Sequence, residues 1–227
     1  MTAALVNLAL ADVIRRLPPL DWAGMITEYT ALTCKAEYDT CARRLGVSAD
    51  SLRRLGAGLY RPGVWAWPMY GPDGVCGIRL RSDAGKKWAV EGSKAGLFIP
   101  DGAVPDLLTE IAVVEGPTDC AAALDLGLWA IGRPSCTGAV PCTVDVCRGR
   151  DVVILADRDS LKTRSNGTTF RPGQEGATIL ARALHRQARS IKIVYPLRGK
   201  DCRAWLQAGA TPAVVRCVVQ NALEWKP

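Results

Sequence analysis

Three acidic side chains stand directly after short apolar runs in this chain. Glu115 follows the run 111–114, and Asp157 and Asp159 follow the run 152–156. Short apolar runs bounded by turn signals are typical of buried parallel strands, and such sheets place their sites at the carboxyl ends of the strands. Three carboxylates gathered there would repel one another unless a divalent cation neutralised them. The sequence therefore predicts a site for magnesium and phosphates.

The residues next to these acids fit the edge of a sheet. Gly116 permits a tight turn after Glu115, and Pro117 suits the first turn of a helix, where its missing N–H is not needed. Asp157 and Asp159 lie two positions apart, so their side chains share one side of an extended segment. Mg²⁺ binds protein through one or two carboxylates and otherwise holds water and substrate phosphates. We expect this pair to hold Mg²⁺ (or Mn²⁺), and Glu115 to hold a second ion or to move a proton.

The composition favours a polyanionic partner and disfavours several other classes of protein. The 227 residues carry a formal net charge of +7, and 48% of them are hydrophobic, which suffices for a core. Nine cysteines occur without a CxxC pair and with a single histidine, so we expect neither zinc nor a disulfide framework. Charges interrupt the longest apolar stretches, so we expect no membrane span. Reduced thiols and the lack of a signal peptide predict a cytoplasmic protein.

The first half of the chain changes from a helical to a strand pattern. We predict amphipathic segments over 3–17 and 22–32, short helices over 38–45 and 49–55, and strands over 64–70, 75–81 and 87–90. Gly46 ends one short helix and Ser48 caps the next, a helix-turn-helix that we interpret as a packing unit because no basic recognition helix stands out. Gly71-Pro72-Asp73-Gly74 predicts a hairpin turn, and Pro68 indicates an edge strand or an interrupted one.

Basic side chains gather on the strands of this first half. Arg79 and Arg81 alternate with apolar neighbours and so share one sheet face, and Lys86 and Lys87 follow after the next turn. A solvated face and a phosphate-binding face both fit this pattern.

The second half alternates strands with helices. We predict strands over 111–114, 129–131, 152–156 and 191–195, a loop rich in Gly and Cys after the second strand, and helices ending near residues 126, 188, 206 and 223. This alternation predicts an α/β fold, with a mostly parallel sheet flanked by helices and a small α+β subdomain before it. We divide the chain into an N-terminal basic subdomain (1–105), a catalytic domain (106–210) and a C-terminal helix (211–227).

An extended basic stretch separates the third of these strands from its helix. Residues 160–175 include Lys162, Arg164 and Arg171 and leave the mouth of the expected metal site. A flexible surface insertion and a clamp on nucleic acid or triphosphate both fit this stretch.

Two motifs of the second half resemble a known domain. Val113-Val114-Glu115-Gly116-Pro117-Thr118-Asp119, followed by Asp157-Arg158-Asp159, resembles the TOPRIM domain of bacterial and phage primases, topoisomerases and some nucleases. The resemblance implies a TOPRIM-like sheet, with Glu115 as catalytic acid and Asp157 and Asp159 as the metal-binding pair. Asp119 matches the acid that closes the first motif, with Gly116 in a supporting role.

Further segments resemble primases in particular. Gly199-Lys200-Asp201 resembles the Lys-Asp segment after the last TOPRIM strand of phage primase-helicases, which implies a supporting role for Asp201. The segments 67–74, 77–81, 86–87 and 95–98 are similar to the subdomain that precedes TOPRIM in bacterial-type primases, where basic residues contact template and nucleotide. This similarity implies such contacts here for Arg79, Arg81 and Lys87. We also count Lys86 and Lys200 among the candidate residues that bind nucleic acid or nucleotide.

The leading hypothesis is a primase-like nucleotidyltransferase. It would make short primers on single-stranded DNA from nucleoside triphosphates, with two bound Mg²⁺ or Mn²⁺ ions. A separate helicase is a candidate partner, because the sequence contains no GxxxxGK[ST] loop. Two alternatives stay open: a TOPRIM nuclease, in which the same metals activate water, and a non-catalytic nucleic-acid-binding replication accessory protein. A topoisomerase is disfavoured, because the chain is too short for a strand-passage gate.

Overall fold

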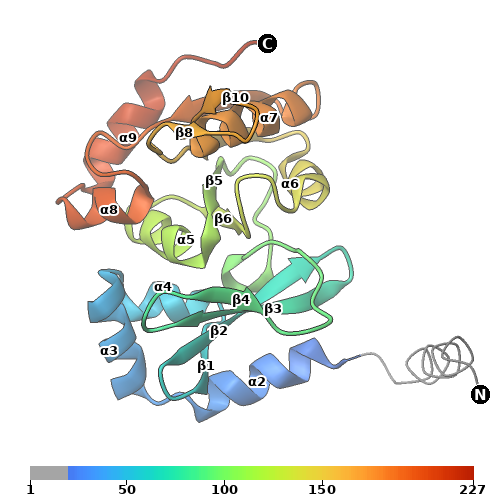
Figure 1. The fold of residues 1–227 in the computed structure, drawn as a ribbon, viewed down its shortest axis with the longest axis vertical. Helices are drawn as coiled ribbons and strands as arrows, with labels where there is room; N and C mark the ends of the chain where they lie inside the picture. The colour runs from blue at the N-terminus through green and yellow to red at the C-terminus, as the bar shows by residue number, and fades with distance from the viewer. Residues whose placement is uncertain (1–19) are drawn as a thin grey trace, which may run out of the picture.

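The computed structural model describes residues 20–227, which fold around two four-stranded β-sheets (Figure 1). The amphipathic segment predicted over 3–17 lies outside the described residues. The helices and strands of the N-terminal part are α2 (Trp22–Leu32), α3 (Lys35–Leu45), α4 (Ala49–Arg54), β1 (Gly58–Arg61), β2 (Val64–Gly71), β3 (Gly74–Ser82) and β4 (Lys87–Ala89). Those of the C-terminal part are β5 (Ile111–Glu115), α5 (Gly116–Asp125), β6 (Ala130–Arg133), α6 (Val140–Cys147), β7 (Asp151–Leu155), β8 (Lys162–Thr163), β9 (Thr169–Phe170), α7 (Pro172–Leu184), β10 (Ser190–Val194), α8 (Cys202–Gln207) and α9 (Pro212–Asn221).

The C-terminal part is a parallel sheet covered by helices on both faces. Its strand order is β10-β7-β5-β6, and every neighbouring pair runs parallel. Helices α6 and α7 lie over one face, whereas α5, α8 and α9 lie over the other (Figure 1). Parallel strands covered on both faces must be apolar throughout, which explains why β5 and β7 read as continuous apolar runs. The predicted α/β class with a mostly parallel sheet is confirmed.

The N-terminal part is an antiparallel sheet in the order β1-β2-β3-β4, packed on α2. Gly71 pairs with Gly74 across the predicted hairpin turn. The pairing of β1 with β2 stops at Ala66, two residues before Pro68. Pro68 therefore pairs only with β3, and no strand on the β1 side needs the N–H that proline lacks. Gly46 ends α3 in the left-handed conformation, and the Ser48 hydroxyl caps α4, as the sequence predicted.

Two segments interpreted as loops contain regular structure. Residues 140–147 form α6, whose buried residues Thr143 and Cys147 lie four positions apart on one helix face. The stretch 160–175 contains the β8–β9 hairpin, and α7 begins within it at Pro172. Glycine and proline suggested irregular chain at both places, but Pro141 and Pro172 stand in the first turns of their helices, where proline is tolerated.

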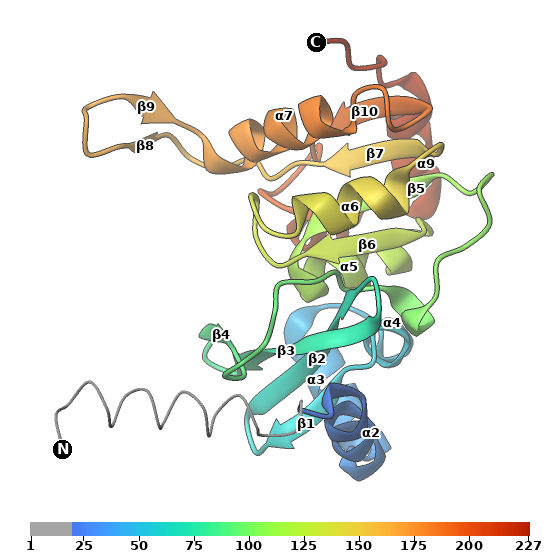
Figure 2. The ribbon, with the colours of Figure 1, turned by 90° about the vertical axis from the view of Figure 1, so that its right-hand side faces the viewer.

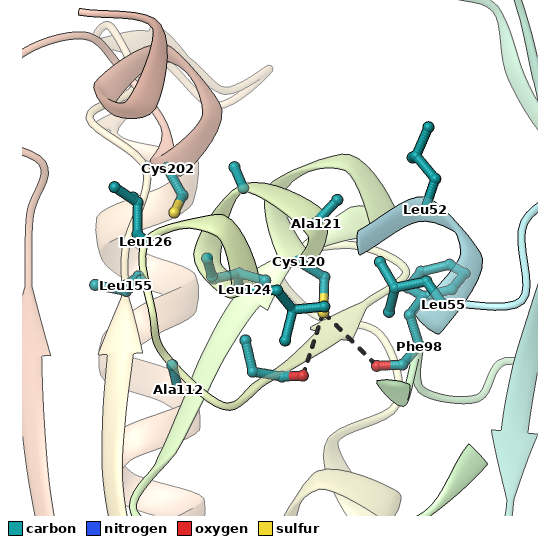
Figure 3. Packing of buried hydrophobic residues seen from close by; sticks show 14 of the residues in the cluster. Leu52, Leu55, Phe98, Ala112, Cys120, Ala121, Leu124, Leu126, Leu155 and Cys202 are labelled. Atoms are coloured by element: carbon teal, nitrogen blue, oxygen red, sulfur yellow. Dashed lines mark hydrogen bonds between the residues drawn. The ribbon is translucent and has the colours of Figure 1, made fainter. Parts of the chain in front are cut away.

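The two sheets share one hydrophobic core. Phe98, which is fully buried, forms an antiparallel bridge with Gly132 of β6. Leu52 of α4 and Leu55, which follows that helix, pack in the same cluster as α5. The Cys120 thiol of α5 lies at the centre of this cluster, 3.3 Å from the carbonyl oxygen of Ala130 (Figure 3). A continuous core of this kind positions the antiparallel sheet rigidly against the parallel one.

Asp125, at the end of α5, fastens the start of α4. Its carboxylate accepts hydrogen bonds from the Ser48 N–H at 2.6 Å, from the Ser48 hydroxyl at 2.6 Å and from the Ser51 hydroxyl at 2.5 Å. Replacing Asp125 by alanine should lower the free energy of unfolding by about 2 kcal/mol, because hydrogen bonds to a charged group are each worth more than neutral ones and Ser51 would stay buried without an acceptor. Urea unfolding measures this loss, and an unchanged midpoint would contradict it.

The described residues contain neither a membrane-spanning helix nor a disulfide bond. Within residues 20–227, no helix is long and apolar enough to cross a membrane. All nine cysteines are free thiols.

Candidate active site

The structure brings two of the three predicted acids to one edge of the parallel sheet. Glu115 is the last residue of β5, and Asp157 lies two positions past the end of the neighbouring strand β7. Both side chains line a cleft of about 310 Å³ at the carboxyl ends of the strands. Asp159 is not among the residues that line this cleft; its carboxylate accepts a hydrogen bond from the Gly173 N–H at 2.9 Å. Its negative charge nevertheless acts on Glu115.

Two further carboxylates lie at the floor of the cleft. Asp119 of α5 is buried and accepts a hydrogen bond from the Arg203 N–H at 2.9 Å. Asp201 is also buried and caps α8 by accepting a hydrogen bond from the Ala204 N–H at 2.8 Å. Asp119 therefore ties the start of α8 to α5, and Asp201 fixes the first turn of α8.

The surroundings of the acids in the cleft disfavour their negatively charged forms. Burial, and then the charges of the surrounding carboxylates, raise the pKa of Asp157 to about 8. Burial and the charge of Asp159 likewise raise the pKa of Glu115, although Arg133 acts in the opposite direction. Carboxyl groups with raised pKa values in a cleft are typical of functional sites, and a bound cation would restore them to the ionised form.

The carboxylate oxygens of the cleft fit a hard divalent cation whose remaining ligands are water and phosphate oxygens. Among residues 20–227, no three His, Cys, Asp or Glu side chains already surround one point closely enough to hold a metal ion. Mg²⁺ needs only one or two carboxylates when water and phosphate oxygens complete its shell. Asp157 lines the cleft and could supply one, and Asp159 would supply another if its hydrogen bond to Gly173 were exchanged for the ion. Glu115, on the same edge of the sheet, could hold an ion or accept a proton.

Cations of the antiparallel sheet line the opposite wall of the cleft. Arg79 and Arg81 share one face of β3, and Lys87 of β4 pairs with Arg81 on the neighbouring strand. Lys200, which precedes α8, also lines the cleft. Burial, followed by the charge of neighbouring arginines, lowers the pKa of both Lys87 and Arg81. These four cations are thus positioned to face anions, although they make no ion pair with Glu115 or Asp157.

Lys86 is placed differently from these four. Its ammonium group lies 5.7 Å from the centre of the Trp88 ring, and it does not line the cleft. Its predicted role in binding nucleotide or nucleic acid stays a prediction.

Two arginines of the site were missed from the sequence. Arg133 ends β6 in register with Glu115, is 3% exposed and has a guanidinium nitrogen without a hydrogen-bond partner. Arg203 lines the cleft, and its Nε atom is buried and also lacks a partner. Arg133 follows a short apolar run, so the rule that found Glu115 could have found it too. Arg203 lies inside a helix, and no local signal marks it.

Gly173 positions both aspartates of the second motif. Its N–H donates to Asp159, and a Cβ atom at this position would lie 2.6 Å from the backbone oxygen of Asp157. Replacing Gly173 by alanine should displace Asp157 and weaken Mg²⁺ binding about 10–100-fold, as loss of a supporting contact usually does. Isothermal titration with MgCl₂ measures this effect. Gly71→Ala is the control, because its backbone is not left-handed and a Cβ atom there would meet only the Cys76 side chain, at 3.3 Å; equal affinities for both variants would contradict the prediction.

Comparison with solved structures identifies the architecture. The catalytic core of E. coli primase superposes with a TM-score of 0.62 at 14% identity, over 88% of this chain and 79% of that one. The RNA polymerase domain of Mycobacterium tuberculosis primase gives a TM-score of 0.59 at 15% identity, over 88% and 82% of the two chains. This chain has the fold of a primase catalytic core.

A phage protein has the same fold. The primase domain of a bacteriophage T7 complex, described as bound to an RNA/DNA hybrid and dTTP, superposes with a TM-score of 0.57 at 14% identity, over 86% of this chain and 98% of that one. No protein-family model and no curated protein matches the sequence. The resemblance to TOPRIM primases is thereby confirmed at the level of the fold, including the antiparallel sheet that precedes the parallel one.

Proposed function

We propose that this protein is a metal-dependent nucleotidyltransferase that synthesises short primers on single-stranded DNA. The observation that carries the proposal is the cleft itself, in which Glu115 and Asp157 face Arg79, Arg81 and Lys87 on a primase-core fold. Unneutralised carboxylates on one wall and cations on the other match a substrate that brings both metal ions and phosphates.

Each side chain has a separate task in this proposal. Two Mg²⁺ or Mn²⁺ ions, when bound, would polarise the phosphate oxygens and lower the pKa of the attacking hydroxyl. Asp157 and Asp159 would hold the ions, and Arg79, Arg81, Lys87 and Lys200 would neutralise the triphosphate as charge develops on it.

Glu115 would move the proton in this proposal. The 3′-hydroxyl oxygen bonds to the α-phosphorus of the incoming nucleotide, pyrophosphate leaves, and the hydroxyl proton passes to the Glu115 carboxylate. The pKa of this group is raised by burial and by Asp159, which brings it closer to the working pH, as a general base requires.

The proposed primer synthesis also implies which molecules the protein binds and where it acts. Single-stranded DNA would be the template and nucleoside triphosphates the substrates, as the T7 relative bound to an RNA/DNA hybrid and dTTP suggests. A separate helicase would deliver the template, and the reaction would take place in the cytoplasm.

The test is a priming assay with purified protein. Single-stranded DNA of mixed sequence is incubated with labelled ribo- or deoxynucleotides and with Mg²⁺ or Mn²⁺, and oligonucleotides are resolved by gel electrophoresis. Metal-dependent products would support the proposal. If no product forms with either metal while labelled DNA is cut, the site is a nuclease; if neither occurs, catalysis by this route is excluded.

A further inference from the structure

The β8–β9 hairpin stands apart from the body of the protein. Within residues 20–227 its two strands pair only with each other, and every residue from Ser160 to Thr169 is exposed. Figure 2 shows the hairpin projecting beyond α7, on the side toward which β6 and β7 point. We call the exposed residues 160–169 the arm; five of them lie on each side of its tip. At about 3.3 Å per residue, five extended residues span roughly 17 Å. The hairpin therefore adds nothing to the core, and its residues are free to contact a ligand beside the acidic cleft.

The charge and the surface of the hairpin both suit a nucleic-acid strand. Residues 160–171 include Lys162, Arg164 and Arg171 and no acidic residue. Lys162 pairs directly with Phe170, so these two and Arg164 share one face of the hairpin. The Arg164 guanidinium lies 4.1 Å from the centre of the Phe170 ring, which leaves its outer face for a base to stack on. Cations combined with stacked planar groups are the features that bind single strands without sequence preference.

The base of the hairpin is connected to the candidate active site. Gly173 donates its N–H to Asp159, and Arg164 forms an ion pair with Glu175 in the first turn of α7. Through these contacts the arm is held at a fixed position relative to the acids, rather than hanging from a free loop. A triphosphate held by the cleft cations would lie inside the cleft, whereas the arm lies outside it, so the arm fits the strand rather than the nucleotide.

We propose that the β8–β9 hairpin is a clamp for the single-stranded nucleic acid that runs past the acidic cleft. Lys162 and Arg171 contact its phosphates from opposite faces of the hairpin, and the stacked Arg164–Phe170 pair supports a base. This inference rests on the proposed function, because it assumes that a template strand passes the cleft.

The test compares two charge-reversal variants of the full chain. Lys162→Glu combined with Arg171→Glu changes the hairpin, and Arg216→Glu combined with Lys226→Glu makes the same change in net charge at exposed residues near the amino ends of the sheet strands. Binding of a fluorescent single-stranded DNA is followed by anisotropy at several salt concentrations, and thermal unfolding verifies that both variants are folded. We expect the hairpin variant to bind at least about tenfold more weakly, with its salt slope reduced by about 1.4, which corresponds to two lost phosphate contacts. The control should stay within about twofold of the unchanged protein.

The outcomes separate the clamp from the proposed function. Equal affinities for the two variants would overturn the clamp while leaving primer synthesis untouched. A raised KM for nucleotide with unchanged DNA affinity would overturn it as well, because the arm would then contact the triphosphate. If the unaltered protein does not bind single-stranded DNA at all, the proposed function itself fails. A Phe170→Ala variant adds a second criterion, since loss of stacking should weaken binding without changing the salt slope.

Discussion

Replacing Asp157 by asparagine is expected to reduce primer synthesis by at least about 10³-fold while the protein remains folded. The carboxylate is one of two that line the cleft from the ends of β5 and β7, and asparagine keeps its shape but cannot neutralise a divalent ion. Metal ions contribute several kcal/mol to such reactions, and each 1.36 kcal/mol corresponds to a factor of ten in rate. The measurement is the rate of dinucleotide formation under saturating substrate.

The matched control is Asp145→Asn, an exposed carboxylate on α6 that pairs with Arg148 away from the cleft. It should leave the rate unchanged. Unaltered synthesis by the Asp157 variant would refute the assignment. If instead a variant with asparagine at both Asp157 and Asp159 kept its biological activity, the protein would be a nucleic-acid-binding accessory protein and not an enzyme.

Magnesium is expected to raise the melting temperature by roughly 5–10 °C at pH 8 and by much less at pH 5. Below about pH 3, Asp157 is protonated in both the folded and the unfolded chain. As the pH rises toward the folded-state pKa of about 8, the carboxyl ionises freely only in the unfolded chain, so the free energy of unfolding falls. A bound cation removes this penalty and adds its own binding free energy, about 2.7 kcal/mol at a concentration 100 times its Kd, which corresponds to several degrees for a protein of this size.

Thermal unfolding at several pH values, with MgCl₂ or with EDTA, measures this effect. The Asp157→Asn variant is the control, because without the ionisable group the metal-free protein should be more stable at pH 8 and should respond less to magnesium. A melting temperature that is independent of magnesium at pH 8 would be incompatible with a metal site at these acids.

The parts of this structure that could be predicted from the sequence are those with local causes. Glu115 and Asp157 were found because an apolar strand followed by an acid is a signal carried by a few neighbouring residues. The cap at Ser48 and the left-handed Gly46 depend on single residues in the same way. The shared sheet face of Arg79 and Arg81 follows from strand alternation alone, whereas the position of Lys87 beside Arg81 depends on the pairing of β4 with β3.

The features that could not be predicted from the sequence depend on contacts between segments that are distant in the chain. Arg203 enters the cleft only because Asp119, 84 positions earlier in the chain, accepts its N–H. Asp159 lies away from the cleft lining because Gly173 donates to it, and that contact exists only once α7 has packed beside β7. The sequence predicts loops where the β8–β9 hairpin and α6 form, because both segments contain glycine, proline or cysteine. These residue types occur in loops and also in tightly packed turns, so they do not distinguish the two.

The bridge between Phe98 and Gly132 joins the wall that carries the arginines to the strand beside Glu115. Because α4 and α5 are packed into the same interior, the two walls should melt in a single transition. In the proposed reaction, nucleotide and template would therefore enter a cleft whose width is set by this shared core, and discrimination would come from fit and charge instead of from closure around the substrate.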